Sequence, residues 1–290
     1  MTVDERLDTG AIYALTASGN GMLYAARASG LYRSEDGSDW QPITVEDATN
    51  YIVTAVATSS KTVLAGTNGA IIRSGDGGMS FSLIGMARPA PLVTALALSS
   101  GFEADGFAIA GTAEDGVFVS EDGGITWVPW NYGLIDLDVH AVVISPNFAA
   151  DKTVFAAVET GLYRSRNAGR SWQRVDFPDE QTPVLALCFY VDGLYAGSEV
   201  GGLLRSVDNG VSWRVIDLGE WQGKAINQLV ATDTALYVLI EDALLRLGSN
   251  LSEVKLVQSF PQRTPLTLYP YQDKWLIGFA EGDLISLNAQ

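Results

Sequence analysis

The sequence predicts an all-β protein made of seven similar small sheets, and three observations support this. A five-residue pattern recurs along the whole chain, an eight-residue turn pattern follows most of its copies, and the remaining segments are short apolar runs without helical periodicity. The chain has 290 residues, 47% of them hydrophobic, which is ample for a large core. Its 30 glycines recur at intervals and indicate turns.

The five-residue pattern sets the period of the repeat. Its copies begin roughly forty residues apart, a spacing typical of four-stranded propeller blades. They start at Gly30, Ala70, Gly116, Gly161, Gly202, Ala243 and Gly282. We therefore expect a single seven-bladed β-propeller over residues 1–290. Its units are expected at approximately 10–48, 49–88, 89–135, 136–180, 181–222, 223–261 and 262–290 together with 1–9.

Each unit is expected to hold four strands in chain order. First strands are expected at 12–18, 52–59, 92–99, 139–145, 184–190, 226–232 and 266–269. Second strands are expected at 23–27, 63–67, 107–112, 154–159, 194–199, 236–241 and 275–280. The five-residue pattern is the third strand. A fourth strand is expected from the aromatic residue that ends the turn pattern in the first five units, namely Trp40, Phe81, Trp127, Trp172 and Trp213.

The last unit ends with its third strand. A ring left open there would expose unpaired sheet edges, which native proteins avoid. We therefore expect residues 2–7 to pair with residues 284–287 and to close the ring as the fourth strand of the last blade.

The eight-residue pattern is Ser-x-Asp-x-Gly-x-(Ser/Thr)-aromatic, and Ser120–Trp127 is its clearest copy. Its acidic position carries Asp36, Asp76, Asp122 and Asp208, with Asn167 as a substitute. We expect this side chain to accept hydrogen bonds from backbone N–H groups two and three residues on. The glycine at the fifth place permits a positive φ, and Ser38 replaces it in the first copy, which is one residue shorter.

Five near-identical copies around a ring cannot all be one active site, and the spacing of a calcium-binding EF-hand loop is absent. We therefore expect these turns, including their aromatic residues, to be structural. The motifs resemble BNR or Asp-box repeats, which occur in sialidases, tandem-propeller xyloglucan hydrolases, sortilin-type receptor domains and photosystem II assembly factors of the YCF48/HCF136 kind. The resemblance covers nearly the whole chain. It implies the propeller fold, with the boxes between third and fourth strands and functional residues elsewhere.

Composition limits the class of partner. The formal charge of −16 and pI near 4.3 argue against nucleic acid, because phosphate would be repelled.

The start of the chain has no apolar signal segment and no run approaches membrane-spanning length. We expect a soluble chain, cytoplasmic as written with an exported form as the alternative, and no direct insertion into a membrane. One histidine and one cysteine leave no catalytic triad and no His/Cys zinc site, so we expect neither metal nor cofactor.

Two enzyme classes share the resemblance. A sialidase needs a triad of converging arginines, whereas the arginines of the five-residue pattern occupy one repeated place in different units, at Arg33, Arg73, Arg164, Arg205 and Arg246. The xyloglucan hydrolases place their cleft between two propellers, whereas this sequence predicts a single propeller. A glycoside hydrolase with two carboxylates on one face stays the alternative function.

The face opposite the Asp boxes is the expected binding surface. It carries the turns between second and third strands and the connections between units, which are acidic and interspersed with aromatic residues. The candidates are Tyr51, Glu114, Asp115, Trp130, Tyr132, Glu159, Glu199, Trp221, Glu241 and Asp242. Such a rim suits a protein or a basic peptide, and a glycan less well. The alternative is a solvated acidic surface whose aromatic residues pack between blades. We therefore expect a non-enzymatic binding or assembly module.

The entrances of the first strands are expected to line a mostly polar axial channel. The aligned positions are Tyr13, Thr54, Thr94, His140, Leu185, Asn227 and Thr267. His140 is the only histidine of the chain and a further candidate for binding.

Overall fold

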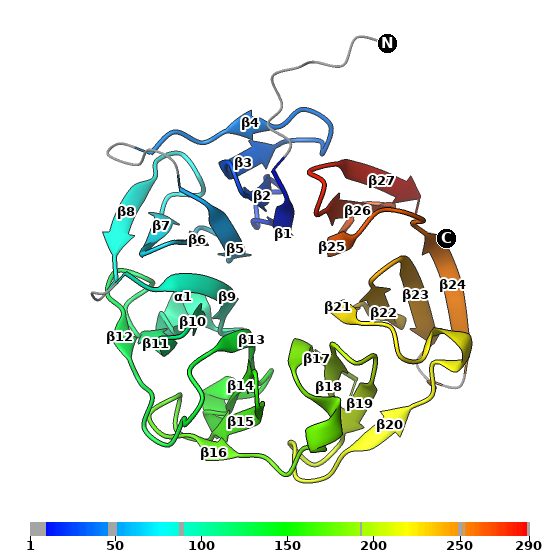
Figure 1. Ribbon diagram of the computed structural model, residues 1–290. Helices are drawn as coiled ribbons and strands as arrows, with labels where there is room; N and C mark the ends of the chain where they lie inside the picture. The colour runs from blue at the N-terminus through cyan, green and yellow to red at the C-terminus, as the bar shows by residue number, and fades with distance from the viewer. Residues whose placement is uncertain are drawn as a thin grey trace, which may run out of the picture.

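The computed structural model describes residues 10–45, 51–86, 90–191, 193–248, 251 and 253–288. They form seven antiparallel sheets arranged in a ring, a seven-bladed β-propeller (Figure 1). In each blade the strands follow one another outward from the axis in chain order, so that the first strand lies innermost (Figure 1). The predicted fold class is therefore confirmed.

The first four blades have four strands each. Blade 1 comprises β1 (Ile12–Ala17), β2 (Leu23–Arg27), β3 (Gly30–Ser34) and β4 (Gln41–Pro42). Blade 2 comprises β5 (Val53–Thr58), β6 (Val63–Thr67), β7 (Ala70–Ser74) and β8 (Ser82–Gly85). Blade 3 comprises β9 (Leu92–Leu98), β10 (Ala108–Ala113), β11 (Gly116–Ser120) and β12 (Val128–Pro129). Blade 4 comprises β13 (Val139–Ile144), β14 (Val154–Val158), β15 (Gly161–Ser165) and β16 (Gln173–Arg174).

The last three blades complete the ring. Blade 5 comprises β17 (Val184–Tyr190), β18 (Gly193–Ser198), β19 (Leu203–Ser206) and β20 (Arg214–Ile216). Blade 6 comprises β21 (Ile226–Ala231), β22 (Ala235–Ile240), β23 (Ala243–Gly248) and β24 (Val254–Ser259). Blade 7 has three described strands, β25 (Pro265–Tyr271), β26 (Lys274–Phe279) and β27 (Leu284–Asn288). The expected pairing of residues 2–7 with β27 lies outside the described residues.

Blade 6 has the expected fourth strand, β24, although no octapeptide precedes it. Some short elements were not expected from the sequence. Single-turn helices α1 (Phe102–Asp105) and α2 (Phe148–Asp151) join the first and second strands of blades 3 and 4. Two short 3₁₀ turns, η1 (Asp179–Gln181) and η2 (Gly219–Trp221), lie between blades. No helix in the described ranges has the length and apolar character needed to cross a membrane.

The core lies between the blades rather than at the axis. Each sheet has two apolar faces, and seven clusters of buried residues fill the seven interfaces between neighbouring blades in the described part of the chain. One of them joins blade 7 to blade 1, where Leu276 packs with Ile12 and Leu23. The same junction has a hydrogen bond from Tyr271 Oη to the Glu35 carbonyl (2.8 Å). Side-chain packing therefore connects the last blade to the first.

The octapeptides form turns in which serine and aspartate bind the local backbone. In the copy at 120–127, Asp122 Oδ1 accepts the N–H groups of Ile125 (3.0 Å) and Thr126 (2.9 Å), three and four residues on. Asp76 and Asp208 do the same. The expected spacing of two and three residues is therefore wrong for these copies. It holds only in the shortened first copy, where Asp36 accepts from Ser38 and Asp39.

The first copy keeps the glycine of the fifth place, which is Gly37, so the expectation that Ser38 replaces it is wrong. Gly37 N donates to Ser34 Oγ (2.9 Å), just as Gly124 N donates to Ser120 Oγ (2.9 Å). The indole of Trp40 also donates to the Gly37 carbonyl, as Trp127 does to that of Gly124. The missing residue therefore precedes the glycine. The hydroxyl donor to the aspartate also shifts, from the second residue after the glycine, as at Thr126, to the first, Ser38.

The octapeptide turns also bind neighbouring blades. A Cβ at Gly124, which has a φ of +82°, would lie 2.7 Å from Leu64 of blade 2. The guanidinium of Arg33 donates to the Gly78 carbonyl (3.2 Å), and Arg73 Nε donates to that of Gly123 (2.7 Å). Arg164 likewise contacts the Asn209 carbonyl. These third-strand arginines therefore hold the next blade's turn and do not converge on a ligand.

Candidate functional site

A cavity of about 270 Å³ lies on the propeller axis, and first-strand residues of all seven blades line it. Every first strand has an irregularity in its pairing with the second strand, and the displaced residue lines this cavity. Such β-bulges redirect a side chain. The seven residues are Tyr13, Thr54, Thr94, His140, Leu185, Asn227 and Leu266. In blade 7 this residue is Leu266 and not Thr267, which is buried, so the expected channel position there is wrong by one residue.

Three of the polar bulge residues hold the ring together. Thr54 Oγ1 donates to the Val93 carbonyl, Thr94 Oγ1 to the Val139 carbonyl, and Asn227 Nδ2 to the Pro265 carbonyl at 2.8 Å. Each acceptor belongs to the first strand of the following blade. These side chains already have partners, so they are poor candidates for ligand recognition.

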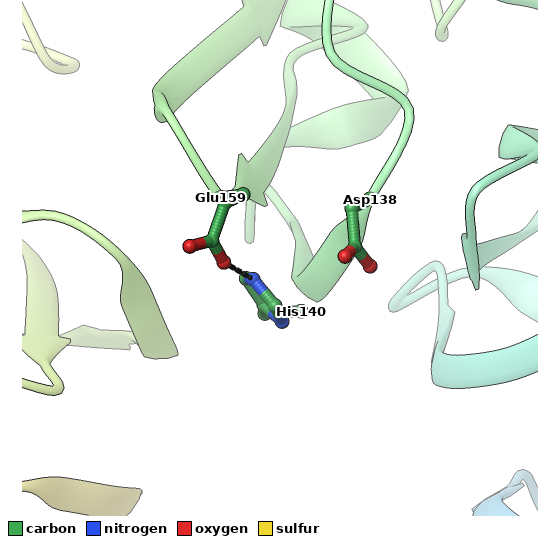
Figure 2. A group of neighbouring side chains, drawn as sticks. All are labelled: Asp138, His140 and Glu159. Atoms are coloured by element: carbon green, nitrogen blue, oxygen red, sulfur yellow. Dashed lines mark hydrogen bonds and ion pairs between the residues drawn. The ribbon is translucent and has the colours of Figure 1, made fainter.

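His140 differs from the other bulge residues because its ring faces carboxylates. Its Nε2 lies 2.9 Å from Glu159 Oε2, and its side chain is 24% exposed. Asp138 lies on the other side of the imidazole (Figure 2). One ring nitrogen of His140 and one carboxylate oxygen each of Asp138 and Glu159, the atoms that could bind a metal ion, lie within 4.8 Å of one another. The three side chains come from the connection before β13, from β13 itself and from the β14–β15 turn.

Asp136 fixes the backbone that carries these three residues. Its Oδ1 accepts the Asp138 N–H (3.1 Å), and its Oδ2 accepts the N–H (2.8 Å) and hydroxyl (2.7 Å) of Thr160. The Glu159 N–H also donates to the Asp138 carbonyl (3.1 Å). Burial raises the pKa of Asp136, but the hydrogen bonds from Thr160 and Asp138 outweigh it and leave that pKa below its usual value. The ionised carboxylate of Asp136 therefore connects the loop before β13 to the β14–β15 turn through hydrogen bonds.

Glu159 has counterparts in the next two blades. The N–H groups of Glu159, Glu199 and Glu241 donate to the carbonyls of Asp138, Pro183 and Ala225, each two residues before a bulge residue. The three glutamates therefore occupy the same place in blades 4, 5 and 6. All three are exposed. The corresponding residues of blades 1, 3 and 7 are Ala28, Ala113 and Ala280. The axial mouth thus has an acidic arc on one side, formed by Glu159, Glu199 and Glu241.

The other acidic candidates lie in the same turns but have different surroundings. Glu114 and Asp115 form the β10–β11 turn, where Asn131 Nδ2 donates to the Asp115 carbonyl (3.0 Å). Asp242 pairs with Lys224 on the adjoining connection. Asp242 is therefore partly neutralised, whereas the side chains of Glu199 and Glu241 make no ion pair or hydrogen bond within the described part of the chain.

The aromatic candidates do not form one surface. Trp130 packs into the apolar cluster between blades 3 and 4, with the Arg170 guanidinium 4.7 Å from its ring. Its carbonyl accepts the indole N–H of Trp172 (2.8 Å). Trp221 packs partly buried against the cluster between blades 5 and 6. Tyr51 is half-buried, and Tyr132 is 81% exposed. Trp130 and Trp221 therefore pack between blades, as the alternative interpretation of this face expected.

The sole cysteine has no nucleophilic character. Burial raises the pKa of the Cys188 thiol to about 12, so it remains protonated at neutral pH.

Comparisons with known proteins identify the fold and no family. No family model matches this chain, and no curated protein matches it by sequence. Among solved structures it is similar to YCF48 from Cyanidioschyzon merolae, with 16% identity, a TM-score of 0.72, and coverage of 97% of this chain and 96% of that one. A structure of YCF48 bound to D1 peptide matches with 17% identity, a TM-score of 0.75, and coverage of 97% of this chain and 94% of that one.

An enzyme has the same fold. The GH74 xyloglucanase from Xanthomonas campestris matches with 17% identity and a TM-score of 0.75, covering 97% of this chain. This chain spans 52% of that enzyme's length. At these identities the similarity shows a shared seven-bladed propeller architecture and does not determine activity.

Proposed function

We propose that this protein is a non-enzymatic binding or assembly module that takes a basic segment of a partner polypeptide on the face opposite the octapeptides. The observation that carries the proposal is the acidic arc. Three glutamates occupy one structural place in consecutive blades, and one of them, Glu159, contacts His140, which lines the cavity to which all seven blades contribute.

The chemistry of the arc favours a cation. Glu199 and Glu241 are exposed and their carboxylates have no partner in the described residues, so a lysine or arginine side chain could bind them without displacing an existing contact. The formal charge of −16 would also steer a basic segment toward the protein. The similarity to a YCF48 structure with a bound peptide supports a polypeptide ligand.

An inverting glycoside hydrolase has less support. An inverting hydrolase separates its two carboxyl groups by roughly 6.5–9.5 Å, leaving space for water. At the axial mouth, ligand atoms of Asp138 and Glu159 lie within 4.8 Å, with His140 between them (Figure 2). This pair therefore lacks the spacing expected of an inverting enzyme.

A peptide selection tests the proposal. A random peptide library is selected on the wild-type protein, and the enriched peptides are then titrated against Glu199→Gln/Glu241→Gln. We expect enrichment of lysine and arginine and at least a tenfold loss of affinity, since charge-assisted hydrogen bonds each contribute about 1.5–3 kcal/mol.

A matched variant controls for bulk charge. Glu35→Gln/Asp233→Asn removes the same charge from two exposed residues, both at the end of the blades away from the acidic arc. It should change affinity less than twofold. Equal losses in both variants, or enrichment of uncharged peptides, would contradict the proposal. Hydrolysis of a glycan panel that depends on an acidic residue of this face would favour the enzyme alternative.

A further inference from the structure

We propose that Asp138, His140 and Glu159 bind one divalent transition-metal ion, with Zn²⁺ as the best-fitting ion, at the mouth of the axial cavity. Each residue offers one ligand atom, and those atoms already lie within 4.8 Å of one another (Figure 2). This site is distinct in chemistry from the recognition of a basic segment by Glu199 and Glu241.

The ligand set selects the class of ion. An imidazole nitrogen with two carboxylate oxygens suits Zn²⁺, and also Co²⁺ or Ni²⁺, whereas Mg²⁺ and Ca²⁺ prefer oxygen ligands alone. His140 is the only histidine of the chain, and the structure places it beside two carboxylates rather than in an apolar interface. The cluster is therefore more than a group of acidic residues.

The spacing of His140 and Glu159 is close to that of two ligands on one metal ion. Two adjacent ligands at about 2.1 Å from one zinc ion lie roughly 3.0–3.4 Å apart. His140 Nε2 and Glu159 Oε2 are 2.9 Å apart, so they need to separate only slightly to share an ion. Asp138 is half-buried at the end of its connection and its oxygen lies within 4.8 Å of the other two ligand atoms, so it needs to move closer to share the same ion.

The surroundings hold the ligands in place and leave the ion accessible. Asp136 binds both the Asp138 N–H and the Thr160 N–H, which fixes the two loops that carry the carboxylate ligands. His140 lines the axial cavity of about 270 Å³, so the remaining coordination positions open onto water or a ligand there. With three protein ligands and an open position, the site has the donor number of accessible zinc centres rather than closed structural ones.

Isothermal titration of Zn²⁺ into tag-free, EDTA-treated and dialysed protein tests the proposal. We expect one ion per chain, and at least tenfold weaker binding by Asp138→Asn, His140→Ala and Glu159→Gln. Glu199→Gln, at the equivalent place in the next blade, is the matched control and should bind like wild type. Co²⁺ should give a visible absorption band that His140→Ala abolishes.

Folding is monitored separately. Each variant should melt in EDTA within a few degrees of wild type, and His140→Gln replaces His140→Ala if the latter unfolds. Wild type that binds no Zn²⁺, or that binds it no more tightly than both His140 variants, would overturn the proposal. An equal loss in Glu199→Gln would also overturn it, because binding would then reflect general negative charge.

Discussion

Acidic residues at the two ends of the blades have opposite surroundings. In the octapeptide turns, Asp122 accepts hydrogen bonds from Ile125, from both the N–H and the hydroxyl of Thr126, and from Ser120. At the other end, Glu199 and Glu241 are exposed and their side chains have no partner within the described residues. The same chemical group therefore stabilises the backbone on one face and remains available for a ligand on the other.

The largest expected effect comes from the glycine of an octapeptide turn. Gly124→Ala puts a side chain at a φ of +82° and within 2.7 Å of Leu64. We expect a loss of about 2–4 kcal/mol in the free energy of unfolding, from backbone strain and overpacking together. Thermal melting measures it. Gly85→Ala is the control, since no atom lies within 4 Å of its added Cβ, and a similar loss there would refute the proposed strain.

Acid should destabilise the octapeptide end selectively. Hydrogen bonds from the Ser38 N–H and hydroxyl lower the pKa of Asp36 to about 2, and those from Ser80 and Ser212 lower the pKa values of Asp76 and Asp208. Because the folded-state pKa is depressed, this stabilisation is complete above the unfolded value of about 3.9 and is lost as the pH falls through the folded value.

Asparagine substitution isolates this contribution. Asn167 accepts the Ser171 N–H (2.9 Å) and its amide donates to the Ser171 hydroxyl (2.9 Å), so the turn forms without a carboxylate. Asp76→Asn/Asp208→Asn should therefore fold at neutral pH and lose less stability than wild type between about pH 5 and pH 2. Melting temperatures across that range decide it, and an unchanged pH profile would contradict the assigned role of these carboxylates.

A smaller effect is expected at the contact between blades. Arg73→Met removes the hydrogen bond to the Gly123 carbonyl (2.7 Å) but retains most of the aliphatic volume. We expect a loss of about 1 kcal/mol, the usual net contribution of one hydrogen bond. Arg214→Met, on the exposed outer strand β20, should change stability by less than about 0.5 kcal/mol. Indistinguishable chemical denaturation of the two variants would argue against the contact.

The repeats made the fold predictable, because each blade repeats the same turn chemistry and the same apolar strands. Ser120, Gly124 and Trp127 carry that signal in the clearest copy. The sequence did not show where the first copy lacks a residue, because either Gly37 or Ser38 could match the glycine of the fifth place. The hydrogen bond from Gly37 N to Ser34 Oγ identifies Gly37 as the match. The sequence left two alternatives for Trp130, binding and packing between blades, because its contacts with Arg170 and Trp172 of the next blade show only in the structure.

The candidate site was only partly predictable. The sequence indicated an acidic loop face that includes Glu159, Glu199 and Glu241, but it did not show that these three are structurally equivalent. Pairing of Val139 with Val158 brings His140 next to Glu159, and a bulge then turns His140 toward the axis. Alternation along an ordinary strand does not reveal a bulge, so the grouping with Asp138 required coordinates.

The central claim is that ligand binding depends on the acidic arc and not on total charge. The most direct test is an equilibrium titration of one selected basic peptide against two charge-matched proteins, Glu199→Gln/Glu241→Gln and Glu35→Gln/Asp233→Asn. We predict that the dissociation constant of the first variant is at least tenfold larger than that of wild type, and that the second variant has the wild-type value. Equal affinities of the two variants would contradict the claim.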